Sequence, residues 1–192
     1  LLIHRNELSK RYHESARKLQ DADIESGEWN HIFNSISESL NEVEIQFIQR
    51  FRYSMIIQIY SFLETELNTY CQTVYENSNT NFRLTDLKGA NDIDKVKIYL
   101  SKLLDIDISK KPSWKFINDL RKLRNVIVHH DGVFSSEYRD YKSIKEFSKD
   151  NFMVKGNAEI SFLRFDNPEF IKDCLDSVQR FLLDVIKHKH IA

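Results

Sequence analysis

The chain of 192 residues contains only four glycines and two prolines. Tight turns depend on these two residue types, because glycine reaches positive φ angles and proline presets the turn geometry. A β-sandwich or β-barrel of this length would need many such turns. Their scarcity predicts few and long elements, and therefore an all-α fold. Hydrophobic residues make up 41% of the sequence, which is enough for the core of a single domain over residues 1–192.

Apolar residues recur every three or four positions through most of the chain, which is the period of an amphipathic helix. The predicted helices span residues 5–20, 32–74, 92–104, 112–130, 137–147 and 168–186. The segment 32–74 is read either as two helices or as one long helix bent near residues 50–52. The sequence therefore predicts a bundle of long antiparallel helices.

One short segment departs from the helical period. Phe152-Met153-Val154 and Ile160-Ser161-Phe162-Leu163 flank a turn that contains Gly156. Two short apolar runs around a glycine turn are typical of a β-hairpin. We expect a small hairpin insertion over residues 150–164, and neither an internal repeat nor a linker that would separate domains.

The overall charge excludes a general attraction to nucleic acid or to anionic lipid, because the formal net charge is −1. Cys71 and Cys174 lie far apart, without a Cys-x-x-Cys pairing, and are predicted to be reduced core residues of a cytoplasmic protein. The most apolar stretch, residues 55–57, is far too short to span a bilayer, so no membrane association is expected. The first residues have no signal-peptide pattern and no initial Met, and we expect the sequence to begin inside a longer chain.

The predicted helix over 112–130 carries the residues with useful chemistry. At about 100° per residue, its apolar face consists of four residues: Phe116, Leu120, Leu123 and Ile127. Arg121, Asn125 and His129 fall on the opposite side, and Arg124 falls at the border, where a long side chain can reach over. His130 falls near the apolar side and is predicted to pack at, or cap, the end of its helix.

Two further features of this helix favour a function over a merely solvated face. Val128 is apolar on the otherwise polar side, which indicates that this face meets another surface. Residues 110–124 contain six basic residues and a single acid, Asp119. A basic run is usually a solvated face. This basic run adjoins His129, an acid–base side chain at the end of a helix, where phosphate chemistry would need it.

The segment Arg124-Asn125-Val126-Ile127-Val128-His129 resembles the motif of the HEPN family, in which a polar residue directly follows Arg and His comes after four to six intervening positions. A second segment, Tyr60-Ser61-Phe62-Leu63-Glu64 with Leu67 and Cys71, is similar to the earlier long helix of that family. The resemblance covers roughly residues 40–185.

The resemblance implies a metal-independent endoribonuclease. In this family the motif helices of two protomers face each other in a homodimer and build one composite site. Carried over to this chain, His129 would exchange protons with the 2′-hydroxyl or the leaving 5′-oxygen of RNA. Arg124 would hold the scissile phosphate, and Asn125 would orient the phosphate or the partner's histidine. Attack by the 2′-oxygen would leave a 2′,3′-cyclic phosphate and would need no metal or cofactor.

RNA is the substrate that the resemblance implies, and we expect Lys115, Arg121 and Lys122 to contact it beside the motif. The family also implies a toxin or phage-defence role, with an antitoxin protein as a second partner. One toxin branch carries a tyrosine two positions after the motif histidine, where this chain has Asp131, so no particular antitoxin is inferred.

Several alternatives stay open at this stage. A non-catalytic HEPN-like module would bind RNA, nucleotide or a partner protein through the same groove. In a purely structural dimerisation domain, Arg124 and His129 would only pair with acids. Glu64, inside an apolar helical run, either supports the site from behind or pairs with a basic residue, and we expect the pair. Glu28 and His31 have the spacing of a di-iron ligand pair, but a single copy does not make a site, so no metal is expected.

Overall fold

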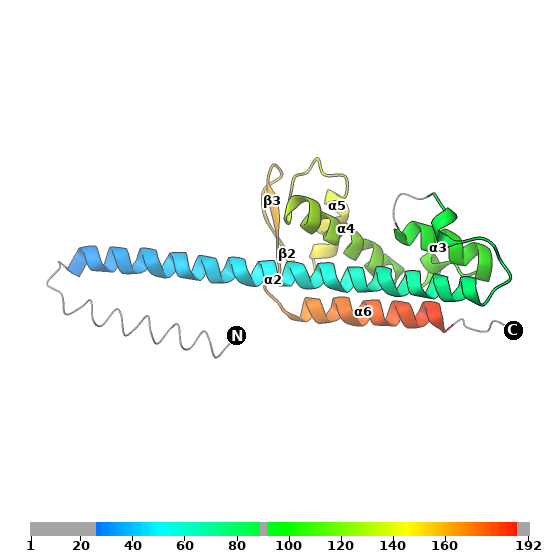
Figure 1. The fold of residues 1–192 in the computed structure, drawn as a ribbon. Helices are drawn as coiled ribbons and strands as arrows, with labels where there is room; N and C mark the ends of the chain where they lie inside the picture. The colour runs from blue at the N-terminus through cyan, green and yellow to red at the C-terminus, as the bar shows by residue number, and fades with distance from the viewer. Residues whose placement is uncertain (1–25, 89–91, 188–192) are drawn as a thin grey trace. The chain divides into compact units, whose positions relative to one another are not determined.

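The computed structural model describes residues 26–88 and 92–187. These residues form five α-helices and a small three-stranded sheet, so the predicted mainly helical fold is confirmed (Figure 1). The helices are α2 (Ser26–Glu76), α3 (Asp92–Leu104), α4 (Trp114–His130), α5 (Tyr141–Ser148) and α6 (Glu169–Ile186), with the short 3-10 helices η1 (Leu84–Asp86) and η2 (Ile108–Lys110).

The chain divides into two compact units, residues 1–48 and residues 49–192. In the first unit the structure describes the beginning of α2, where Leu40, Val43 and Phe47 are all more than half exposed. The helix predicted over residues 5–20 lies outside the described residues. The candidate site lies in the second unit alone.

The predicted helices agree with the observed ones in most places. The expected helix over 92–104 coincides with α3. Every residue of Ser26–Glu76 is helical, so of the two alternatives for residues 32–74 the structure has one long helix. The helix α4 begins at Trp114, two residues after its predicted start at residue 112. The helix predicted over 137–147 begins only at Tyr141, because the preceding residues form hydrogen-bonded turns, with Tyr138 N–H donating to Ser135 O at 3.0 Å.

The predicted hairpin is also confirmed. The strands β2 (Met153–Gly156) and β3 (Ser161–Arg164) pair antiparallel, and Gly156 turns the chain at a φ of 102°. A third strand, β1 (Val133–Phe134), pairs with the other edge of β3 and gives the order β1-β3-β2. The sequence did not reveal β1, since two residues are too few to show an alternating pattern.

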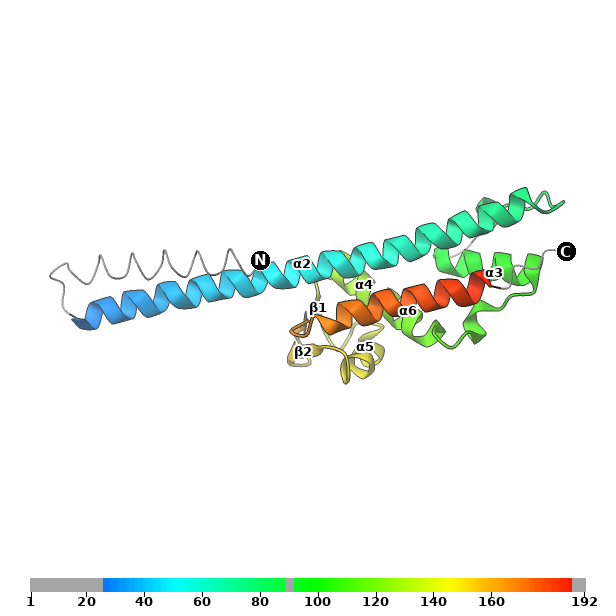
Figure 2. The ribbon, with the colours of Figure 1, turned by 90° about the horizontal axis from the view of Figure 1, so that it is seen from below.

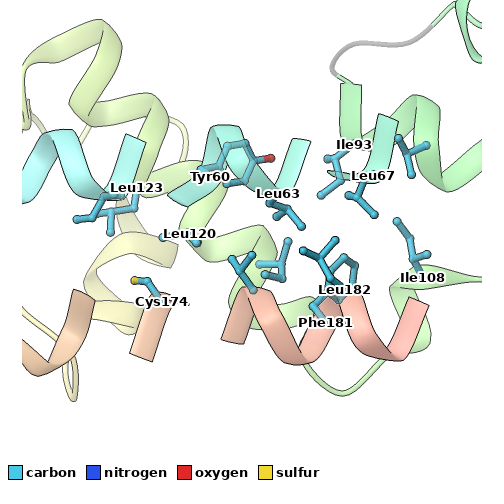
Figure 3. Close-up of a cluster of buried hydrophobic side chains, with 14 of the residues drawn as sticks. Tyr60, Leu63, Leu67, Ile93, Ile108, Leu120, Leu123, Cys174, Phe181 and Leu182 are labelled. Atoms are coloured by element: carbon cyan, nitrogen blue, oxygen red, sulfur yellow. The ribbon is translucent and has the colours of Figure 1, made fainter. Parts of the chain in front are cut away.

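The core of the second unit lies between α2, α4 and α6 (Figures 2 and 3). Gln49 of α2 contacts Phe165 just before α6, and the Trp114 ring lies 6.1 Å from that of Phe181 near the other end of α6. Figures 1 and 2 show α2 and α6 running in the same direction and α4 running opposite to α6, so the predicted antiparallel arrangement holds for α4 against α6 but is wrong for α2 against α6. Figure 3 shows side chains of α2 meeting those of α4 and α6 in this core.

Both cysteines are free and buried in the core, as predicted. Burial raises the pKa of the Cys71 thiol to about 12 and that of Cys174 further still. Across the described ranges, no helix has both the length and the apolar character that crossing a bilayer requires.

Candidate functional site

The end of α4 is held by contacts from α2 and from the sheet. Asp131 ends the helix in the left-handed region, and Gly132 follows with a φ of 79°. The Tyr53 hydroxyl donates to the carbonyl of Leu163 at 2.8 Å, and Leu163 N–H donates to the carbonyl of Gly132 at 2.9 Å. Arg50 pairs with the Asp131 carboxylate on the surface. The last turn of α4 therefore has a position fixed from two sides.

The apolar face of α4 lies where the sequence predicts it. Leu120 and Leu123 are fully buried, Ile127 is 5% exposed, and the half-buried Phe116 ring lies 5.2 Å from that of Phe147. The buried arc is wider than predicted because α4 is covered both by α2 and by α6. It extends to the border position at which Arg124 lies.

The two adjacent histidines differ in their surroundings. The His130 ring contacts the Tyr138 ring edge-on, with 5.3 Å between centroids, so the predicted packing at the end of its helix is confirmed although the residue remains exposed. His129 is exposed on the polar side, and among the described residues no hydrogen bond or ion pair occupies its imidazole. The imidazole of His129 is therefore free to exchange protons with a bound molecule.

Asn125 and Arg124 lie one turn before His129. Asn125 is half-buried, and its Oδ1 accepts a hydrogen bond from Arg124 Nη1 at 3.2 Å. Val128, on the same side, is 42% exposed, as expected for a residue that meets another surface. Asn125, Val128 and His129 thus lie on one side of α4, and Arg124, at the border of the buried arc, binds Asn125 with its guanidinium.

The Arg124 side chain reaches over toward α2, as its border position predicted. Its Nε atom is buried and has no hydrogen-bond partner. Burial raises the pKa of the Glu64 carboxyl on α2 above its ordinary value of 4.5, and the Arg124 charge lowers it in part. Glu64 therefore interacts electrostatically with Arg124, but within the described residues the expected direct ion pair is not formed.

Tyr60 and Arg121 complete this group, which we call the α2–α4 polar cluster (Tyr60, Glu64, Arg121 and Arg124). The hydroxyl of Tyr60 and the Nε of Arg121 are also buried without a partner. Burial and the Glu64 charge raise the pKa of Tyr60, and both guanidinium groups lower it in part. Figure 3 shows the Tyr60 ring on α2 within the core.

The cluster holds three of the four buried, unpartnered side-chain atoms found in the described part of the chain. A buried polar atom without a partner costs about 1–3 kcal/mol, so these three atoms lower the stability of the contact between α2 and α4. The sequence alone did not lead us to assign Tyr60 to the site. The pattern that could have done so is the spacing of Tyr60 and Glu64, which lie four residues apart on one helical face.

The three lysine and arginine residues predicted to contact RNA are not equally available. Lys115 is exposed, and Arg121 is half-buried with one Nη donating to Asn118 at 3.0 Å. Lys122 is turned inward: its Nζ lies 3.0 Å from Asp119, in an ion pair whose side chains are 16% and 10% exposed. We therefore leave Lys122 out of the proposed RNA surface, because its ammonium already neutralises the one acid of the basic run.

The described residues contain no group of three or more His, Cys, Asp or Glu side chains placed to hold a metal ion. The side chain of Glu28, one of the two residues with di-iron spacing, lies outside the described part. Comparison of the chain with family models, curated proteins and solved structures gave no match. The likeness to the HEPN family accordingly depends on the residues of this sequence.

Proposed function

We propose that this chain is a HEPN-type endoribonuclease that cleaves RNA without a metal ion. The observation that supports it is the exposed, unoccupied imidazole of His129, one helical turn from Asn125 and from the guanidinium that Asn125 binds. The family resemblance adds a toxin or phage-defence setting and an antitoxin as a further partner.

The residues of α4 have the chemistry that transesterification of RNA requires. His129 accepts the proton of the 2′-hydroxyl while the 2′-oxygen attacks phosphorus, and the bond from phosphorus to the 5′-oxygen breaks. Arg124 binds the non-bridging oxygens, whose charge increases in the transition state, and guanidinium matches phosphate geometry. The 5′-oxygen leaves with a proton. The products are a 2′,3′-cyclic phosphate and a 5′-hydroxyl.

A second copy of the chain is part of the proposal. One imidazole cannot accept the 2′-hydroxyl proton and donate another to the leaving oxygen at the same moment. A homodimer with its motif helices facing each other brings a second His129 to the same phosphate. Val128, which is 42% exposed beside the motif, provides an apolar contact between the two helices.

The test is cleavage of a labelled RNA by purified protein in EDTA. His129→Ala and Arg124→Ala should each lower the cleavage rate by about 100-fold or more, the usual contribution of a general base or of a transition-state donor. The matched control is His130→Ala, which removes the neighbouring exposed imidazole and should leave the rate unchanged. Cleavage that EDTA abolishes would reject a metal-independent mechanism. An equal loss of cleavage in all three variants would reject His129 and Arg124 as its catalytic residues.

One observation favours a second candidate function. Arg124 is half-buried with its Nε enclosed, which leaves less of its guanidinium for a transition state and fits a non-catalytic HEPN-like module that binds RNA, nucleotide or a partner protein. RNA binding without cleavage identifies this alternative. A protein that neither binds nor cleaves RNA identifies instead the structural domain in which the motif residues only form pairs.

A further inference from the structure

The three-stranded sheet has one face turned away from the core. Residues directly opposite in antiparallel strands point to the same side. Val133 is opposite Phe162, Phe162 is opposite Lys155, and Met153 is opposite Arg164. These five residues therefore share one side, which we call the outer sheet face. Their neighbours along the strands include the buried Phe134 and Leu163, which face the core.

The outer sheet face combines an aromatic ring with cations. Phe162 is 43% exposed, Val133 44% and Met153 39%. Lys155 is exposed, and Arg164 uses Nε to bind Asp166 at 2.7 Å, which leaves its terminal nitrogens for another acceptor. The face itself carries two basic residues and no acid, in a chain whose net charge is −1.

This composition fits a single strand of nucleic acid better than it fits a protein. An exposed aromatic ring offers a stacking surface to any base, and nearby cations bind the flanking phosphates. Protein interfaces, by contrast, are depleted in lysine at their centre. Bases in a duplex are already stacked and paired, so such a surface selects unpaired RNA.

The outer sheet face lies close to the candidate site along the chain. Val133 follows His129 by four residues, so their Cα atoms are at most about 14 Å apart. The hydrogen bond from Leu163 N–H to Gly132 O, at 2.9 Å, joins β3 to the chain just after α4. Figure 1 shows β3 beside this end of α4. A strand of RNA with its scissile phosphate at His129 would reach the sheet with its next nucleotides.

We propose that the outer sheet face binds single-stranded RNA, with one base stacked on Phe162 and the adjacent phosphates held by Lys155 and Arg164. The inference rests on the proposed function and names its substrate class, an unpaired RNA strand. Phe162 would fix the register of the strand relative to His129.

The test measures binding separately from cleavage. The probe is a fluorescein-labelled 12-nucleotide RNA with 2′-O-methyl groups throughout, which has no attacking 2′-hydroxyl, and the readout is fluorescence anisotropy. Phe162→Ala should raise Kd by about 5- to 100-fold, the range expected for the loss of one stacked base, and Phe162→Trp should retain binding and show quenching of its indole by RNA. Lys155→Glu should weaken binding and reduce its salt dependence.

The matched control is Phe62→Ala, which removes an aromatic side chain that is 50% exposed on α2, outside the sheet. Equal effects of Phe62→Ala and Phe162→Ala, equal affinity for a duplex of the same sequence, or a change of oligomeric state in Phe162→Ala would overturn the inference. If Phe162→Ala loses binding while the unmodified chain does not cleave RNA, the outer sheet face binds RNA but the nuclease is rejected. If the unmodified chain cleaves RNA while Phe162→Ala binds the probe as before, the nuclease stands and RNA binding by the outer sheet face is rejected. An unmodified chain that does not bind the probe would also reject RNA binding by the outer sheet face.

Discussion

Replacing Gly132 with alanine should destabilise the second unit strongly, because this residue ends α4 in a conformation and a space that exclude a side chain. Its φ of 79° lies in the left-handed region, which costs other residues about 1–3 kcal/mol. A Cβ atom at this position would collide with the Tyr53 hydroxyl and lie 2.6 Å from Tyr53 Cζ. Overpacking of this kind costs about 1–3 kcal/mol more.

The two costs add to about 2–6 kcal/mol, against a total stability of about 5–15 kcal/mol for a typical domain. Urea denaturation followed by circular dichroism measures this loss of unfolding free energy. In a thermal melt, the melting temperature should fall by about 5–20 °C, since a loss of 1 kcal/mol lowers the melting temperature of a unit of this size by roughly 2–4 °C. RNA cleavage should fall as well, because a displaced end of α4 also displaces His129.

The collision can be separated from the backbone strain with Tyr53→Leu, which removes the ring that the new Cβ would meet. In the double variant, Gly132→Ala should cost about 1–3 kcal/mol less than it does alone. If the stability losses of the two single variants add up to that of the double variant within about 0.5 kcal/mol, the ring and the glycine do not interact. That result would refute the steric part of the reasoning.

Three further predictions follow from buried charged and thiol groups. Asp119→Ala should lower stability by about 3 kcal/mol, because it leaves the Lys122 ammonium without its partner in a nearly buried pair; a loss below about 1 kcal/mol in urea denaturation would contradict this. Burial raises the pKa of Glu64 above 4.5, so its contribution to stability is greatest at acid pH and is lost as the pH rises through the raised value. Glu64→Gln should remove that dependence, and identical stability–pH curves for both proteins would exclude it. Cys71 and Cys174 should react with a thiol reagent only as fast as the protein unfolds, since burial raises the pKa of both; rapid labelling of native protein would disagree.

Much of the fold could be predicted because it depends on local patterns. Apolar spacing located α3 and α6, and the glycine between two apolar runs located the hairpin. The border position of Arg124 on the helix predicted that its side chain would reach over, and its Nε is buried. These features require only the geometry of one helix or one turn.

The parts that could not be predicted depend on contacts between distant segments. The inward turn of Lys122 needs Ser143 of α5, which donates to the same Asp119 carboxylate. In the α2–α4 polar cluster, Tyr60 interacts electrostatically with Arg121, which lies 61 residues later in the chain. No local pattern carries such information, since each residue taken alone is equally consistent with a solvated surface.

The nuclease proposal is best examined with an RNA that contains one ordinary ribonucleotide in an otherwise 2′-O-methylated strand, incubated with the protein in EDTA and analysed by mass spectrometry. We expect a single cut after that ribonucleotide, with a 2′,3′-cyclic phosphate on one product and a 5′-hydroxyl on the other, and none with His129→Ala. An uncut strand, a cut at a methylated position, or a 5′-phosphate product would contradict attack by the 2′-hydroxyl.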